Sequence, residues 1–156
     1  MSSNKVYKKI IVDGLSILFI VLFIYAAVNK LQQLETFQIQ LEQFPFISEY
    51  TQWIVWVVPI LLIIVSILFL FERMKWIAFY SSFVMMLFFT LYIIAVLNFA
   101  ESIPCSCAGI FNSWSWNDHL YFNMGVLLLA VVGIALSHRL GKSKEETTPI
   151  HFNIES

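Results

Sequence analysis

The chain has 156 residues, of which 60% are hydrophobic and only 12% are charged, and its mean hydropathy is +0.81. These values exclude an ordinary soluble globular domain and indicate an integral membrane protein. The basic residues are few and the formal net charge is -1, so the composition gives no support to nucleic-acid binding.

Four continuous apolar segments are long enough to cross a membrane as helices. A hydrocarbon core about 30 Å thick requires roughly 20 helical residues, and the segments that qualify are 10–28, 53–71, 76–98 and 119–137. They show no alternation of polar and apolar residues, which argues against barrel strands. The first segment carries Asp13 and lacks a small-residue cleavage site, so we expect a span and not a signal peptide. We therefore predict an all-α fold, an integral membrane four-helix bundle that forms one domain over residues 1–140.

The distribution of Lys and Arg predicts the orientation of this bundle. Eight of the nine basic residues fall before the first span, between the second and third, or after the fourth, and only Lys30 lies elsewhere. Cytoplasmic loops retain positive charge, so we expect both termini in the cytoplasm and the protein in a bacterial inner membrane. The segment between the third and fourth spans would then face the oxidising periplasm. The polar stretch 141–156 is predicted to be a flexible cytoplasmic tail.

The connection between the first two spans contains a predicted amphipathic surface helix. Apolar residues recur there at three- to four-residue spacing, with polar residues between them, until Pro45 ends the pattern. The apolar positions are Leu31, Leu34, Phe37, Leu41 and Phe44. Because this helix has too few apolar residues to span, we expect it on the outer surface, near the segment between the third and fourth spans.

The only two cysteines, Cys105 and Cys107, lie in a polar segment between the third and fourth spans. A disulfide between residues i and i+2 is geometrically possible, but its small ring is strained and easily reduced. As a staple it would stabilise the fold by only roughly 1.5 kcal/mol before strain is subtracted. Redox exchange is therefore our preferred interpretation, with a structural disulfide as the alternative. Two thiolates form an incomplete zinc site, and copper(I) with Met124 or His119 is a weaker hypothesis, so we predict no metal.

Several polar residues fall at similar depth near the outer ends of the spans, where they could line a pocket below the cysteine segment. They are Tyr25, Asn29, Tyr92, Asn98, His119 and Asn123. Lys30 and His119 could also stabilise a cysteine thiolate if the bundle brings them close. The alternative is that these groups form hydrogen bonds between helices, and that His119 is only a polar residue in a first helical turn. Asp13, at the other end, is expected to pair with Lys9 or with a helix terminus.

Two motifs carry a resemblance to a known family. The first span ends in AAVNKL (26–31), and PCSCAG (104–109) precedes WNDHL (116–120) and Asn123. With four spans and Pro59 early in the second, the chain resembles the DoxX-like family and, within it, the methylamine-utilisation MauE branch, over roughly residues 8 to 137. Family members often carry an acidic residue shortly after that proline, whereas an apolar run, 60–63, follows here. The resemblance implies participation in periplasmic thiol–disulfide chemistry.

A comparison with DsbB and the vitamin K epoxide reductase family, which are four-helix redox bundles, leads to our main hypothesis. The protein would be a thiol–disulfide oxidoreductase whose Cys105–Cys107 disulfide oxidises a thioredoxin-like or disulfide-containing periplasmic partner. A quinone is the candidate electron acceptor, with the six polar residues named above as candidate lining residues, and no other cofactor is predicted. Those families use two cysteine pairs, and this chain has one. The competing hypothesis is a non-catalytic subunit that anchors or assembles a larger membrane complex, with the cysteines as a structural disulfide.

Overall fold

The computed structural model describes residues 3–42, 48–99 and 116–145, which are almost entirely helical. The elements are α1 (Ser3–Gln32), α2 (Leu34–Glu42), the 3-10 helix η1 (Ser48–Tyr50), α3 (Thr51–Leu68), α4 (Lys75–Phe99) and α5 (Trp116–Glu145). Four helical segments are long and apolar enough to cross a membrane, and they correspond to α1, η1 with α3, α4 and α5. The predicted all-α membrane bundle is confirmed.

The helix boundaries differ from the predicted spans at positions where polar residues continue a helix beyond the apolar segment or where a helix ends within it. α1 begins at Ser3 and α5 continues to Glu145, because Lys, Gln and Glu favour helix although they are too polar for the hydrocarbon core. The predicted start of the tail at residue 141 therefore lies inside α5. α3 ends earlier than its predicted span, at Leu68, where the amide of Leu70 donates to the Ile67 carbonyl at 3.0 Å in a tight turn.

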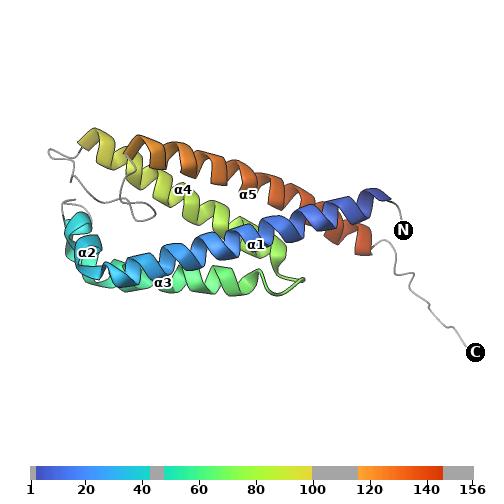
Figure 1. Cartoon of the computed structure of the whole chain (residues 1–156), viewed down its shortest axis with the longest axis horizontal. Helices are drawn as coiled ribbons and strands as arrows, with labels where there is room; N and C mark the ends of the chain where they lie inside the picture. The colour runs from blue at the N-terminus through green and yellow to red at the C-terminus, as the bar shows by residue number, and fades with distance from the viewer. Residues whose placement is uncertain (1–2, 43–47, 100–115, 146–156) are drawn as a thin grey trace, which may run out of the picture.

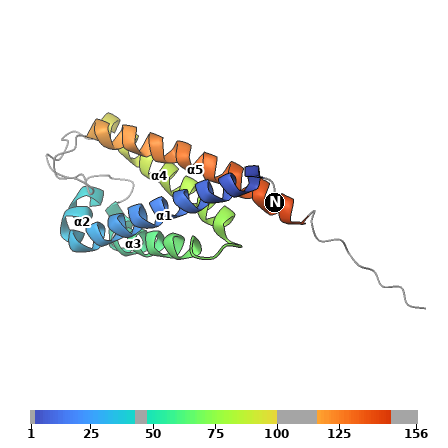
Figure 2. The same cartoon turned by 45° about the vertical axis from the view of Figure 1, so that its right-hand side comes forward.

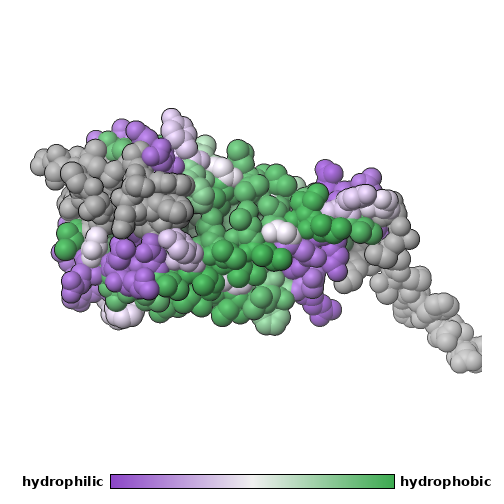
Figure 3. Space-filling view, in the orientation of Figure 1, coloured by the Kyte–Doolittle hydropathy of each residue, from purple (hydrophilic) through white to green (hydrophobic). Residues whose placement is uncertain are grey.

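The long helices alternate in direction, which gives the molecule two chemically different ends (Figures 1 and 2). One end, called the basic end below, holds the start of α1, the α3–α4 turn and the end of α5. The opposite end, called the α2 end, holds α2, η1, the end of α4 and the start of α5. Figure 3 shows an apolar belt between two polar ends, as expected of helices that cross a membrane. The cytoplasmic location of the basic end stays a prediction based on its positive charges.

Four phenylalanines at the centre of the bundle join two helix pairs. α1 packs most extensively on α3, and α4 on α5. The ring centroid of Phe79 in α4 lies 5.7 Å from that of Phe19 in α1 and 4.9 Å from that of Phe69, directly after α3. Phe19 in turn contacts Phe23 one turn along α1, at 5.6 Å. All four rings are buried, so this aromatic cluster holds the two pairs together.

Gly133 allows α5 to approach the same cluster closely. A Cβ atom on Gly133 would overlap the Phe79 ring. Gly14 and Gly125 are different, because a Cβ atom on either would meet nothing within 4 Å. Lipid offers no hydrophobic driving force between helices, so close van der Waals packing around small residues stabilises membrane bundles.

Four buried hydroxyl groups in the spans are satisfied within their own helices. Each hydroxyl donates to the carbonyl oxygen four residues earlier, at 2.7 or 2.8 Å, and the residues are Ser16, Ser66, Ser82 and Thr90. A polar group away from water needs such a partner. The arrangement lets small polar residues pack in the core without forming hydrogen bonds between helices.

Lys75 links α1 to the α3–α4 turn at the basic end. Its Nζ lies 2.6 Å from Oδ1 of Asp13 and 2.8 Å from Oε1 of Glu72. The prediction that Asp13 pairs with Lys9 or with a helix terminus is wrong. The turn brings the start of α4 beside α1, and the side chain of Lys75, only 11% exposed, requires a counter-charge that an outward-facing Lys9 does not.

Replacement of Gly133 by Ala is expected to destabilise the bundle by about 1–3 kcal/mol, because the Phe79 ring must move within a packed core. The midpoint of unfolding in detergent micelles, followed by circular dichroism during titration with a denaturing detergent, measures this effect. Gly125→Ala is the matched control and should be neutral or slightly stabilising, since Ala favours helix over Gly. Equal midpoints for the two variants would contradict the packing role of Gly133.

Asp13→Leu is expected to destabilise the protein by about 2 kcal/mol, because Lys75 loses its closest carboxylate. This free energy lies between those typical for loss of an exposed and of a buried ion pair. The double variant Asp13→Leu/Lys75→Met should recover much of this loss, since no buried charge then remains uncompensated. The same unfolding assay measures both. Glu72→Gln is the control, with a smaller effect, because the Glu72 side chain is 66% exposed. Additive losses in the double variant would show that the ion pair does not couple the two elements.

Candidate functional site

The amphipathic helix predicted after the first span is present as α2, and its apolar face packs on α3. Phe37 and Leu41 are buried against Val55, with Tyr92 of α4 partly buried beside them. α2 follows α1 almost without a break, because the amide of Phe37 donates to the Gln33 carbonyl at 2.9 Å in the joint between the helices. The confirmed helix is shorter than the predicted pattern, and residues 43–47 lie outside the described ranges. α2 therefore covers the first half of α3.

Cys105 and Cys107 lie outside the described residues. The two helices that flank this segment are described. α4 ends at Phe99 and α5 begins at Trp116. Both helix ends lie at the α2 end of the bundle (Figures 1 and 2). The cysteine segment therefore leaves and rejoins the bundle at the same end as α2 and Lys30.

His119 and Asn123 form a buried polar pair at the start of α5. They are 9% and 7% exposed, and their spacing of one helical turn places them on the same inward face. The Nε2 atom of His119 is enclosed by the protein. Asp118, directly before His119, is exposed. An imidazole and a carboxamide thus enter the interior just below the helix end that follows the cysteine segment.

Lys30 brings a positive charge to the same region. It lies in the last turn of α1, and its Nζ is 4.1 Å from the centroid of the Phe37 ring, a cation–π contact that ties α1 to α2. Lys30 and Asp118 are the charged groups that act electrostatically on His119. The sequence analysis singled out Lys30 but missed Phe37 as its partner. Their separation of seven residues, two turns of a nearly continuous helix, was the available signal.

The other predicted site residues take different positions. Tyr25 is 48% exposed on α1. Asn98 is exposed, and its Nδ2 donates to the Ile94 carbonyl of its own helix at 2.7 Å. Asn29 is partly buried, and its Oδ1 accepts a hydrogen bond of 3.3 Å from Gln33. Tyr92 packs on the α2–α3 cluster. The structure thus buries His119 and Asn123 on one face of α5, whereas Tyr25 and Asn98 are exposed and Asn29 and Tyr92 are partly buried.

Comparison with known proteins gives one family. The family model described as "Methylamine utilisation protein MauE" matches residues 8–136, which cover all four membrane-spanning helices except their outermost turns. Neither the curated proteins nor the solved structures give a match.

Proposed function

Because the chain belongs to the methylamine utilisation protein MauE family, and is a multi-pass membrane protein with four spanning helices, we propose that it supports methylamine utilisation through thiol–disulfide exchange at Cys105 and Cys107. The protein would lie in a bacterial inner membrane with its α2 end in the periplasm. The observation that carries the proposal is the family match together with the position of the flanking helix ends of α4 and α5 at the α2 end, where Lys30 and His119 also lie. The wider DoxX-like relationship stays a prediction.

The proposed exchange begins with the disulfide between Cys105 and Cys107. A thiolate of a thioredoxin-like or disulfide-containing periplasmic partner attacks one sulfur, and the resulting mixed disulfide is resolved by the partner's second thiol. The partner leaves oxidised, and Cys105 and Cys107 leave as thiols. Transfer of two electrons and two protons from these thiols to a quinone would restore the disulfide and produce a hydroquinone.

The charges near the α2 end suit this chemistry. A thiolate is the nucleophile and leaving group in exchange, and a nearby cation stabilises it. Lys30 is the cation that contacts α2 through Phe37. Quinone reduction consumes protons, and the buried imidazole of His119, with Asn123 one turn away, is a suitable proton relay and hydrogen-bonding group. Of the six residues predicted to line a quinone, we therefore retain these two as the principal candidates.

The competing function is a subunit that anchors or assembles a membrane complex. It is favoured by the outward face of α3, where exposed apolar side chains suit another membrane protein as well as lipid. These residues are Ile60, Leu61, Ile64 and Ile67. The two functions make opposite predictions for variants of the cysteines.

Either Cys105→Ser or Cys107→Ser should abolish oxidation of the partner, because one thiol cannot form the intramolecular disulfide. Trapping free thiols with a mass tag in intact membranes measures the redox state of the partner and of the pair, with and without quinone depletion. Ser106→Ala is the matched control and should retain oxidation. An oxidised partner in all three variants would overturn exchange, and a stoichiometric complex that survives the double cysteine replacement would then favour the anchoring subunit.

His119→Gln should slow quinone-dependent reoxidation of the cysteine pair by about a hundredfold, the usual scale for loss of a general acid or base. Thiol trapping after addition of quinone to the reduced protein measures this rate. A single turnover of exchange with the partner should be unaffected, which separates a role in proton transfer from a general loss of structure. Tyr25→Phe is the control on an exposed face. Equal reoxidation rates in His119→Gln and the parent would remove His119 from the proposed site.

A further inference from the structure

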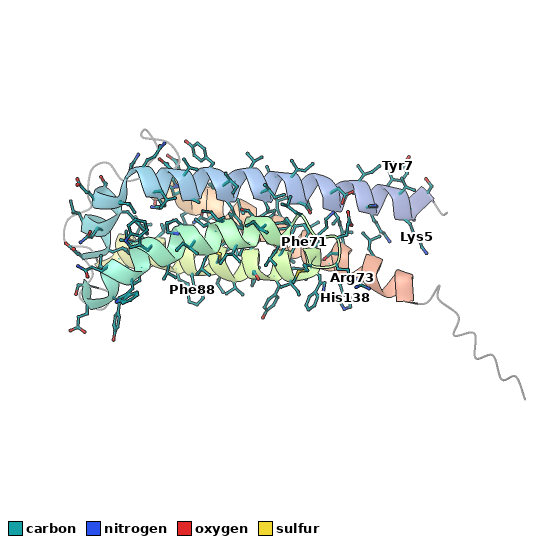
Figure 4. The ribbon with its side chains drawn as sticks, turned by 90° about the horizontal axis from the view of Figure 1, so that it is seen from below. Lys5, Tyr7, Phe71, Arg73, Phe88 and His138 are labelled. Atoms are coloured by element: carbon teal, nitrogen blue, oxygen red, sulfur yellow. The ribbon has the colours of Figure 1, made fainter. Side chains whose placement is uncertain are left out.

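Besides the buried Lys75, the basic end carries seven cations from three separate elements, and the side chains of five of them are described. Lys5, Lys8 and Lys9 belong to α1, Arg73 to the α3–α4 turn and Arg139 to α5. All are exposed except Lys8, which is partly buried. Figure 4 shows that Lys5 and Arg73 lie at the same end of the bundle as His138, the neighbour of Arg139. The fold thus gathers positive charges that are far apart in the sequence.

These five cations have no carboxylate partner among the residues that the structure describes. The ion pairs found there both belong to Lys75, which binds Asp13 and Glu72. The acidic side chains described at this end are therefore already directed at a different, buried lysine. These five cations can therefore bind an external anion without first breaking an ion pair with a described carboxylate.

The lengths of the helices place these cations at the level of lipid headgroups. α1 has 30 residues and is about 45 Å long, whereas the hydrocarbon core is about 30 Å thick. The apolar run of α1 begins directly after Lys9, and that of α5 ends at Leu136, two residues before His138. The surplus turns at both helix ends therefore extend into the layer that contains the lipid phosphates.

Exposed apolar side chains lie at the same end as the cations. They favour a lipid over a soluble anion as the ligand. Tyr7 and Ile10 are exposed on α1, and Phe71 is exposed in the turn that carries Arg73. Figure 4 shows Tyr7 and Lys5 on opposite sides of α1 near its start, and Phe71 near Arg73. A free phosphate would leave these apolar groups in water. A phospholipid contacts the cations with its phosphate and the apolar side chains with its acyl chains and glycerol region.

We propose that the basic end binds the headgroups of anionic phospholipids, with cations of α1, the α3–α4 turn and α5 around the phosphate groups. This site is separate from the proposed redox function, because it lies at the opposite end of the bundle. The binding is electrostatic and so weakens at high ionic strength.

Nanodiscs that contain phosphatidylglycerol and phosphatidylcholine in equal amounts provide the test. Both leaflets then have the same composition, so the orientation of the inserted protein has no influence. Native mass spectrometry of the released protein measures the ratio of the two lipids that remain bound. The parent should retain phosphatidylglycerol preferentially, Arg73→Gln should lower the ratio about fivefold, and Lys5→Gln/Lys8→Gln/Lys9→Gln should remove the preference.

The matched control changes the charge by the same amount at the other end. Gln32→Glu/Gln33→Glu/Gln38→Glu alters two exposed positions and one partly buried position at the α2 end and should leave the lipid ratio unchanged. Unfolding midpoints in phosphatidylcholine alone verify that every variant is folded, and Arg139→Gln provides an independent variant on another helix. An unchanged ratio in the folded basic-end variants would overturn the proposal. An equal loss in the control would also overturn it, because net charge and not this site would then determine lipid binding.

Discussion

The ring of Phe79 makes the contacts on which the arrangement of all four spans depends. It lies on Phe19 of α1, on Phe69 at the end of α3 and on the backbone of Gly133 in α5. A single side chain of α4 therefore meets each of the other three spanning helices. Because lipid tails are as apolar as the helix surfaces, only such close complementary packing distinguishes the folded bundle from separated helices. Position 133 requires glycine because a Cβ atom there would overlap the Phe79 ring. A Cβ atom on Gly14 or Gly125 would meet nothing within 4 Å.

Polar groups are used differently at the centre and at the two ends of the bundle. At the centre, hydroxyl groups such as those of Ser16 and Ser82 bind their own helix and leave packing to the aromatic cluster. At the basic end, the Lys75 ion pairs connect α1 with the α3–α4 turn. At the α2 end, Lys30 binds the face of Phe37, and an imidazole enters the interior at His119. Polar interactions between distant elements are thus concentrated where water and headgroups lower their desolvation cost.

The sequence predicts features that depend on average hydropathy or local periodicity, and fails where a contact joins distant residues. The four spans and the amphipathic helix follow from such averages and are confirmed. The predicted partner of Asp13 was wrong because the actual partner, Lys75, lies 62 residues away in the sequence. Only the α3–α4 turn brings it close. The six polar site residues were chosen by depth alone, and depth does not specify a helix face. Tyr25 is consequently exposed while His119 is buried.

The two proposals are connected by the depth at which the protein sits in the membrane. Cations at the basic end, held at the phosphates of one leaflet, oppose movement of α1 and α5 into the hydrocarbon. At the other interface, exposed Trp53 and Trp56 of α3 have the amphipathic character that favours the opposite headgroup layer. α2 buries Phe37 and Leu41 on protein and so does not need to enter lipid. The proposed redox function requires this depth, because the ends of α4 and α5 would then lie at the membrane surface, where a soluble thiol partner could approach them without crossing hydrocarbon.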